Sequence, residues 1–266
     1  MYRIFSRVKS LESLNKKLNN DAAYGVSKKL QDLIGIRVVL YFSDDIETVR
    51  NILSDCYSEK SKDNSIDIAA NDQFKAVRYN IIYSLDEETI KLIRLGDLSC
   101  KIDNTFELQI RTVFSEGWHE VEHDLRYKNK PDWHGFDRQS RLLNGVYASL
   151  ESSEWMMIKI FDELAYSHYK SNNWPAMLRQ KFRIRFNQDD ISDDLKTILD
   201  KDGIAKKFFR LDRNKIIAEM NNREFYYPLN LNNFIYFCNL VDIKDPEIKS
   251  LTSSTMIMDF EMSQTE

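Results

Sequence analysis

Long apolar runs, paired cysteines and internal repeats are all missing from this 266-residue sequence. No run approaches the roughly 18 consecutive apolar residues that a membrane-spanning helix needs, and the N-terminus has no signal-peptide core, so we expect a cytoplasmic protein. The three cysteines, Cys56, Cys100 and Cys238, are far apart and form no CxxC pair. This spacing indicates neither a disulfide framework nor a thiolate zinc site, and we interpret all three as reduced packing residues.

A strong net charge is also lacking, because 38 basic residues oppose 42 acidic ones and leave a formal charge of -4. The chain as a whole is therefore not drawn to nucleic acid. The charge is unevenly distributed, however, since the first seventeen residues hold only Glu12 as an acidic residue. The basic residues of that segment are Arg3, Arg7, Lys9, Lys16 and Lys17.

The basic segment leads into a short predicted helix, with Ser10 as its N-cap and three leucines at helical spacing. Arg7, Lys9 and Ser13 then lie at the opening end of this helix. Cations and hydroxyls at a helix N-terminus suit a phosphate chain, because they add charge to the free backbone N–H groups. A solvated basic helix explains the same residues, and this alternative stays open.

Two strand signals define the expected core. Residues 36–42 are a nearly continuous β-branched and aromatic run, typical of a strand covered on both faces. Residues 106–112 instead alternate between apolar residues and the polar set Glu107, Gln109 and Arg111, which predicts one buried and one working face. Asp32, just before the first strand, is a candidate carboxylate ligand for Mg²⁺, and an ordinary turn or cap residue is the alternative.

The remaining segments predict an α/β sandwich followed by helices. We expect a helix over 44–53, a loop over 58–73, a strand over 74–85 beside the second strand, and a helix over 113–128. An apolar stripe over 137–166 indicates a long helix that serves as core or interface, so residues 131–170 pack on or link the first domain. We expect a linker at 171–175, a small helical accessory domain over 176–250 and a largely disordered tail over 251–266.

The segment 119–123 matches HExxH, the zinc-protease pattern in which two histidines on one helical face bind Zn²⁺. Here the second histidine, His123, is flanked by Glu122 and Asp124, and no third ligand follows at helical spacing. We therefore regard the match as accidental, and stoichiometric zinc held by His119 and His123 would reverse that interpretation.

Four segments taken together resemble, in the right order, the motifs of the RelA/SpoT synthetase family. They are residues 7–17, 32–37, 107–112 and 120–128, so the resemblance covers roughly residues 1–130. It implies a nucleotidyltransferase-like α/β fold, a mixed sheet flanked by helices, with a mostly helical C-terminal part added. It also implies transfer of pyrophosphate from ATP to the ribose 3′-hydroxyl of GDP or GTP, as in single-domain alarmone synthetases and their toxin relatives.

The resemblance implies roles for particular residues. Asp32 and Glu107 would be the catalytic pair and would hold Mg²⁺, with Glu107 also taking or orienting the 3′-hydroxyl proton. The positions matching ATP binding are Arg7, Lys9, Ser13, Lys17 and Arg37. The positions matching the acceptor side are Tyr79, Gln109, Arg111, His123, Tyr127 and Lys128.

One departure from the family pattern concerns the acceptor. Residues 76–83 stand where the family usually shows Gly-Tyr-x-Ser-x-His, and only Tyr79 is available to replace the aromatic that stacks on guanine. Modification of the 3′ end of tRNA is therefore an alternative, as is a catalytically silent regulatory module. Candidate tRNA-facing cations are Lys28, Lys29, Lys206, Lys207, Arg210 and Arg213. The C-terminal helices are the candidate surface for a homo-oligomer or a regulatory partner.

Overall fold

A computed structural model describes residues 2–67, 78–93, 96–187, 190–201 and 203–263. The chain divides into two compact units, Met1–Glu154 and Trp155–Glu266. None of the helices in the described ranges combines the length and the apolar character that crossing a membrane requires. Each unit is described by itself below.

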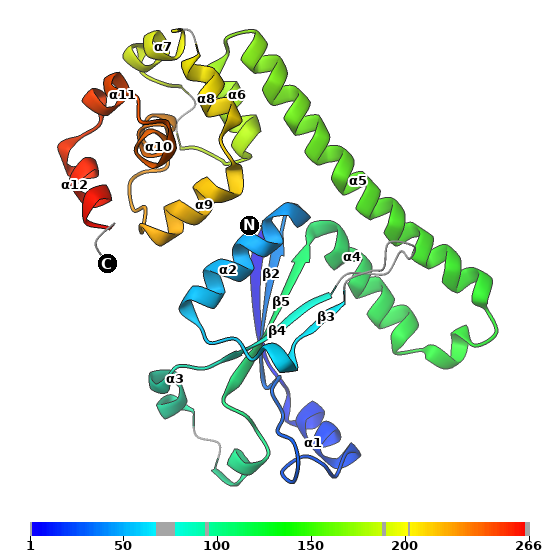
Figure 1. Cartoon of the computed structure of the whole chain (residues 1–266). Helices are drawn as coiled ribbons and strands as arrows, with labels where there is room; N and C mark the ends of the chain where they lie inside the picture. The colour runs from blue at the N-terminus through cyan, green and yellow to red at the C-terminus, as the bar shows by residue number, and fades with distance from the viewer. Residues whose placement is uncertain (1, 68–77, 94–95, 188–189, 202, 264–266) are drawn as a thin grey trace. The chain divides into compact units, whose positions relative to one another are not determined.

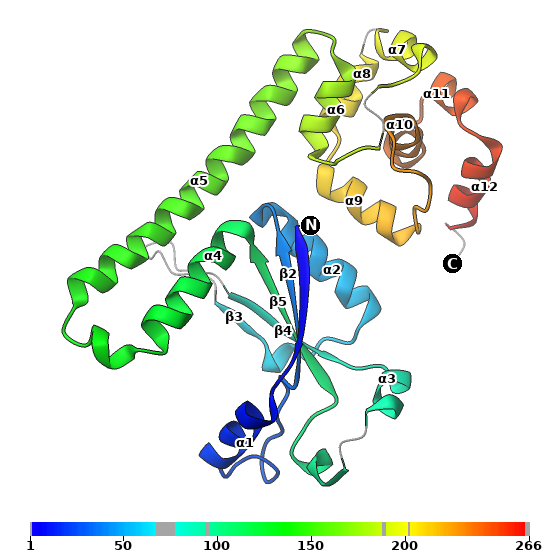
Figure 2. The ribbon, with the colours of Figure 1, turned by 180° about the vertical axis from the view of Figure 1, so that it is seen from behind.

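The first unit is built on a mixed five-stranded sheet in the order β1-β2-β5-β4-β3 (Figure 1 and, from behind, Figure 2). Its strands are β1 (Arg3–Val8), β2 (Ile34–Leu40), β3 (Ser65–Asp67), β4 (Arg78–Ser84) and β5 (Thr105–Thr112). The two central strands, β2 and β5, run parallel, and every other pairing is antiparallel. This arrangement confirms the predicted mixed sheet with flanking helices.

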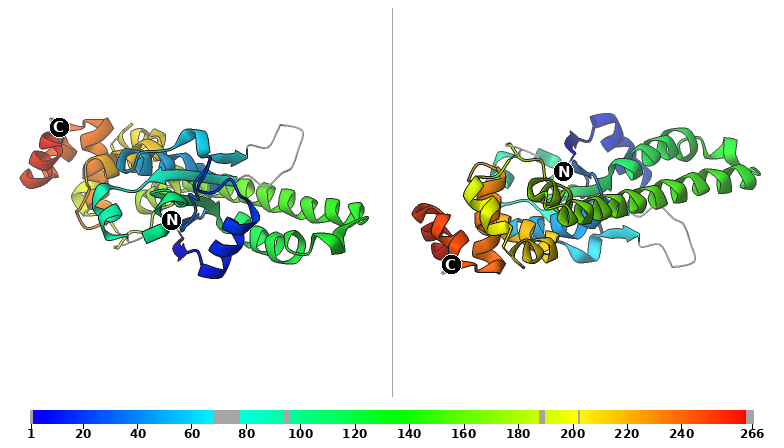
Figure 3. Two further views of the ribbon diagram at one scale, coloured as in Figure 1. Left: turned by 90° about the horizontal axis from the view of Figure 1, so that it is seen from below. Right: turned by 90° about the horizontal axis from the view of Figure 1, so that it is seen from above.

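The helices of the first unit lie on both faces and at one end of the sheet. They are α1 (Leu11–Asn20), α2 (Ile46–Cys56), α3 (Glu87–Leu92), α4 (Val113–Val121), a π-helical turn η4 (Glu122–Tyr127) and the start of α5 (Asp137–Lys170). Figure 3 shows α2 and α4 on opposite sides of the sheet. On the α2 side, Val38, Leu108 and Ile81 of the central strands form a buried cluster with Ile46. The opposite side is left for polar chemistry.

Helix α1 begins as its sequence predicts. The Ser10 hydroxyl accepts the Ser13 backbone N–H at 3.3 Å, which is an N-cap contact. Leu14 is buried with Leu30 and Ile102, so the apolar face of α1 packs on the loops at one end of the sheet. That packing places the basic residues of the N-terminal segment beside the first residues of β2.

The second unit is helical around one large apolar core. It contains the end of α5 and the helices α6 (Trp174–Phe182), α7 (Asp193–Leu199), α8 (Ile204–Arg210), α9 (Arg213–Asn222), α10 (Leu231–Cys238), α11 (Pro246–Leu251) and α12 (Ser254–Met262). A π-helical turn, η6 (Asn239–Ile243), extends α10. The mostly helical C-terminal part predicted from the sequence is confirmed.

Several predicted boundaries differ from the structure. The expected loop over 58–73 contains the short edge strand β3, and the expected linker at 171–175 is interrupted by α6, which begins at Trp174. The tail from residue 251, expected to be largely disordered, forms α12, because Met256 and Phe260 share one helical face and join the core of the second unit. The border between the two units falls inside α5 and not at residue 131.

Candidate active site

The working face of the sheet carries a row of polar side chains from three strands. Glu107, Gln109 and Arg111 of β5 project on the side opposite to the apolar cluster, as their alternation predicts. Arg37 of β2 and Asn80 of β4 are the register partners of Gln109, so both stand on the same face. These side chains line a cleft of about 680 Å³, called here the larger cleft.

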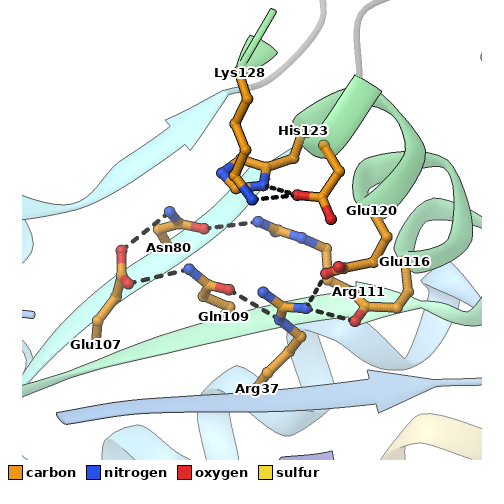
Figure 4. A network of polar contacts seen from close by, with 10 residues as sticks. Arg37, Asn80, Glu107, Gln109, Arg111, Glu116, Glu120, His123 and Lys128 are labelled. Carbon is orange, nitrogen blue, oxygen red and sulfur yellow. Dashed lines mark hydrogen bonds and ion pairs between the residues drawn. The ribbon is translucent and has the colours of Figure 1, made fainter. Parts of the chain in front are cut away.

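A continuous hydrogen-bond network joins these residues (Figure 4). Asn80 Nδ2 and Gln109 Nε2 each donate to a different oxygen of Glu107, both at 3.1 Å. Gln109 Oε1 in turn accepts from Arg37 Nε at 3.0 Å, and Asn80 Oδ1 accepts from Arg111 Nη2 at 3.1 Å. The Glu107 carboxylate is thus held from both sides by neutral amides, each of which is held by a guanidinium.

Helix α4 completes one wall of the larger cleft. Its Glu116 and Glu120, one helical turn apart, both accept from Arg37 Nη1, at 2.6 and 2.7 Å. Burial alone would lower the pKa of Arg37, but the two carboxylates outweigh it and raise that pKa. Glu116 Oε2 is buried and has no hydrogen-bond partner among the described residues.

The start of α4 is fixed by its sequence and by α5. Thr112 and Ser115 form a reciprocal capping box at the junction of β5 and α4. Further along, Trp118 packs against Tyr147 of α5 with ring centroids 4.9 Å apart. Glu154 of α5 is buried and accepts from Thr112 Oγ1 at 2.8 Å. These contacts hold α4 at the sheet, so Glu116 and Glu120 reach Arg37 from a fixed direction.

Asp32 lies just before β2 and is held by two lysines. Its Oδ2 contacts Lys9 Nζ at 3.1 Å and Lys17 Nζ at 2.9 Å. Burial alone would raise the pKa of the Asp32 carboxyl, but the hydrogen bonds and charges of the two lysines outweigh it and lower that pKa. Conversely, burial lowers the pKa of Lys17 by less than Asp32 and Tyr24 raise it. Asp32 is therefore an ionised carboxylate at neutral pH.

Asp32 and Glu107 lie where two hollows meet. Both line the larger cleft, and both also line a second hollow of about 490 Å³. The other residues of the second hollow are Lys17, Tyr24, Ser27, Lys28, Lys29, Gln31, Asp63 and Ile82. A group bound at this carboxylate pair would be accessible from both sides.

The carboxylate pair fits a Mg²⁺ ion. Asp32 Oδ1 is buried and has no hydrogen-bond partner in the described part of the chain, so a ligand position is open there. Within the described residues no cluster of three or more His, Cys, Asp or Glu side chains is arranged to hold a metal. Mg²⁺ commonly binds one or two carboxylates and completes its shell with water and substrate phosphates, so this donor set suits it.

Arg7 reaches the larger cleft across a glycine. The two residues Arg7 and Gly35 are register partners in β1 and β2, and Glu107 is the partner of Gly35 on the other side. A Cβ on Gly35 would lie 3.3 Å from Arg7 Nε and 3.4 Å from Arg7 Cγ. The absence of a side chain at position 35 therefore lets the Arg7 stem lie flat over β2 toward Glu107.

The π-helical turn η4 adds an exposed rim to the larger cleft. His123 and Tyr127 stack with ring centroids 5.7 Å apart, and Asp124 accepts from Lys128 Nζ at 2.6 Å. His123 Nδ1 lies 2.9 Å from the same Asp124 oxygen. A π turn is frequent at functional sites, and here it ends α4 after Val121. In the HExxH segment, His119 contacts the ring of Trp118 edge-on while His123 contacts Asp124 and Tyr127.

The sequence prediction for Tyr79 is wrong. Tyr79 is the register partner of Ile110, and its side chain packs on the apolar cluster beneath α2. It therefore faces away from Glu107 and Gln109. Its neighbour Asn80 is the β4 residue that faces the larger cleft, and residues 76 and 77 of the same stretch lie outside the described residues. The alternation along β4 offered no sign of this, because both faces of the strand carry polar and aromatic residues.

The other predicted site residues separate into three groups. Arg7, Arg37, Gln109, Arg111, His123, Tyr127 and Lys128 all line the larger cleft, so the predicted ATP and acceptor residues share one hollow. Lys9 touches Asp32, whereas the Ser13 hydroxyl accepts from the Ser10 hydroxyl at 2.9 Å and lines neither hollow. Asn80, Glu116 and Glu120 line the larger cleft without having been predicted as site residues.

Of the predicted tRNA-facing cations, two lie at the second hollow. Lys28 pairs with Asp21 and lies over the Tyr24 ring, and Lys29 Nζ donates to a backbone carbonyl. The remaining four belong to the second unit. They are Lys206, Lys207 and Arg210 in α8 and Arg213 at the start of α9.

Comparison with known proteins follows the same residues. Three solved structures are similar in part. Small alarmone synthetase 1 from Bacillus subtilis bound to its product pppGpp is 23% identical over 62% of this chain and 80% of that chain, with a TM-score of 0.46. Small alarmone synthetase 2 from Bacillus subtilis is 22% identical over 61% and 82%, with a TM-score of 0.42. A GTP pyrophosphokinase family protein from Streptococcus pneumoniae is 24% identical over 57% and 73%, with a TM-score of 0.39.

None of the curated proteins compared with the chain matches it. A family model, described as the region found in RelA / SpoT proteins, matches residues 6–132. This match spans β1, the Asp32 loop, β5 and α4, which are the segments that build the larger cleft. The chain therefore contains the RelA/SpoT region, and residues 6–132 belong to that family.

Proposed function

We propose that the chain transfers the β,γ-pyrophosphate of ATP to the ribose 3′-hydroxyl of GDP or GTP and so makes (p)ppGpp. The observation that carries this proposal is the position of Asp32 and Glu107 at the junction of two hollows. Transfer between two nucleotides needs a donor and an acceptor that meet at one reacting centre. The match of residues 6–132 to the RelA/SpoT region supports the same reaction class.

The residues of the site suit each step of this transfer. Lys9 and Lys17 would grip phosphate oxygens of ATP, and Arg7 would reach the same nucleotide over Gly35. Asp32 and Glu107 would hold Mg²⁺, which when bound neutralises charge on the transferred group. Glu107 accepts the proton of the attacking 3′-hydroxyl as the new bond to the β-phosphorus forms and the bond to the α-phosphate oxygen breaks, releasing AMP.

The acceptor is tested by product separation. We would incubate the purified chain with Mg²⁺ and β/γ-labelled ATP, and offer GDP, GTP, no second nucleotide or deacylated tRNA in parallel. Label on a guanosine nucleotide is the expected result. Glu107→Gln should abolish this label with the fold intact, whereas Glu47→Gln, on α2 across the sheet, should keep it. Full activity of the Glu107→Gln variant would overturn the site assignment.

Pyrophosphorylation of the 3′ end of tRNA is the second candidate. It is favoured by Lys28 and Lys29, which line the second hollow beside Asp32 and offer charge to a nucleic-acid backbone. Reversing both charges should then reduce labelling of tRNA and leave labelling of GDP unchanged. Unchanged tRNA labelling in that variant would count against this candidate. No transfer to any acceptor by the folded chain would instead favour a silent regulatory module.

A further inference from the structure

Asn80 makes two contacts that the proposed reaction has not yet used. It lies at the middle of the working face, as the β4 partner of Gln109. Its Nδ2 donates to Glu107 Oε1 at 3.1 Å, and its Oδ1 accepts from Arg111 Nη2 at 3.1 Å (Figure 4). Arg111 itself is buried, with 7% of its surface exposed. Asn80 thus connects a buried guanidinium to the carboxylate at the junction of the two hollows.

Gln109 makes the mirror-image connection on the other oxygen. Its Nε2 donates to Glu107 Oε2, and its Oε1 accepts from Arg37. The orientation of both amides is determined by their partners, because a flipped amide would turn its NH₂ group toward a guanidinium and its oxygen toward a carboxylate. Glu107 is therefore clamped by two amide donors whose direction cannot be reversed.

The clamp leaves Glu107 able to react. An ionised carboxylate offers about four lone-pair positions, and the two amides occupy one position on each oxygen. A direct pair with a guanidinium would usually be bidentate and would occupy both oxygens with a full opposite charge. Two amides placed between the cations and Glu107 instead fix its plane, keep it anionic and leave a position on each oxygen for a metal or a proton. Hydrogen bonds in such a chain also polarise one another.

We infer that Asn80 is a positioning residue for pyrophosphate transfer, acting through Glu107 and jointly with Gln109. This inference rests on the proposed function. Asn80 orients one oxygen of Glu107 and transmits the charge of Arg111 to it without neutralising it. Sequence reasoning assigned no role to this position.

The isosteric variant Asn80→Asp separates positioning from packing. It preserves the volume of the side chain and its contact with Arg111, but it replaces the donor that faces Glu107 with a second carboxylate. We expect kcat for transfer to fall by roughly a hundredfold, the typical effect of misplacing a reacting group, with KM for ATP within about twofold of wild type. A kcat within about twofold of wild type would overturn the inference, as would a loss confined to KM.

Asn64 provides a matched control. Its Nδ2 also donates to a carboxylate, Glu59, at 2.6 Å, and its Oδ1 accepts from the Ile82 backbone N–H at 2.9 Å. Asn64→Asp therefore makes the same chemical change next to β4 but outside the larger cleft. Its kcat and KM should stay within about twofold of wild type. A loss of kcat equal to that of Asn80→Asp would show that the effect comes from the strand and not from Glu107.

A measurement without turnover keeps this inference distinct from the proposed function. The side-chain NH₂ signals of Asn80 and Gln109, assigned in ¹⁵N-labelled protein by the variants Asn80→Asp and Gln109→Glu, report their donors directly. Glu107→Gln should move both signals, because both amides lose the same charged acceptor. If neither signal moves, the clamp does not exist and the inference fails, even in a fully active enzyme. If both move but the wild-type chain transfers pyrophosphate to no acceptor, the proposed function fails and the clamp stands.

Discussion

Arg37 holds the larger cleft together from three directions, so its removal tests the site as a unit. Its Nε donates to Gln109, and its Nη1 donates to Glu116 at 2.6 Å and to Glu120 at 2.7 Å. The variant Arg37→Met keeps much of the apolar stem and deletes all three donors. Arg37 is 26% exposed and Glu116 18% exposed, whereas Glu120 is 56% exposed. The two ion pairs therefore differ in their expected contributions.

The exposed pair with Glu120 contributes about 0.2–1 kcal/mol, as surface ion pairs do. The more buried contact with Glu116 is a charge-assisted hydrogen bond, for which about 1.5–3 kcal/mol is typical. Arg37→Met should therefore lower the free energy of unfolding of the first unit by about 2–4 kcal/mol. Arg138, an exposed residue of α5, offers the control Arg138→Met, which should change it by less than about 0.5 kcal/mol.

Urea unfolding followed by circular dichroism measures this loss, and a second substitution identifies its cause. In Arg37→Met, Glu116 keeps its charge without a partner, so adding Glu116→Gln should recover at least about half of the lost stability. Pyrophosphate transfer should not recover, because Gln109 still lacks the donor that orients it toward Glu107. A loss below about 0.5 kcal/mol in Arg37→Met, or no recovery in the double variant, would refute this account of the cleft wall.

Three further predictions test other parts of the chain. Asp32→Asn should destabilise the first unit at pH 7; because the native pKa of Asp32 is lowered, the difference from wild type should shrink as the pH falls below about 3.9, and an equal difference in urea unfolding at pH 7 and pH 3 would contradict this. Phe260→Ala should lower the free energy of unfolding of the second unit by about 3 kcal/mol, and an unchanged urea midpoint would mean that α12 does not pack. Gly35→Ala should displace Arg7 and raise KM for ATP by up to about tenfold with kcat unchanged, so steady-state kinetics with unaltered KM would contradict the role of Arg7.

The working face of β5 was predictable because its signal is local. Glu107, Gln109 and Arg111 alternate with apolar residues, and the two-residue period of a strand places all three on one side. The run at 36–42 likewise predicted a central strand, found as β2. The positions of Asp32 and Lys17 on the same site followed only from the resemblance to the RelA/SpoT motifs. Their contact depends on α1 packing against the loop before β2, which no local pattern encodes.

The error at β4 has a simple physical cause. Shifting a strand by one residue moves every side chain to the other face, so the choice between Tyr79 and Asn80 depends entirely on register. The register is set by the pairing of Asn80 with Gln109 across two strands that lie far apart in the sequence. Hydrophobic alternation would have fixed it, but β4 carries aromatic and polar residues on both faces. Tyr79 buries its ring under α2, and the smaller amide faces the cleft.

Glu116 and Glu120 were missed for a different reason. Their spacing of four residues on a predicted helix placed them on one face, yet many helices carry such a pair toward solvent. Only the docking of α4, through Trp118 and its capping box, turns that face toward Arg37. The helical tail could have been recognised, since Met256 and Phe260 have the same spacing and are apolar. The polar residues around them hid that signal.

In the ligand-free chain, the cations that suit phosphate are already neutralised from within. Asp32 holds Lys9 and Lys17, and α4 carboxylates hold Arg37. A phosphate chain must therefore compete with internal carboxylates unless those carboxylates gain another partner. Mg²⁺ at Asp32 would be such a partner, because it replaces the two lysines and frees them for phosphate. Binding of Mg²⁺ and of ATP should then strengthen each other by equal factors, so the site becomes positively charged only when the metal that transfer requires is present.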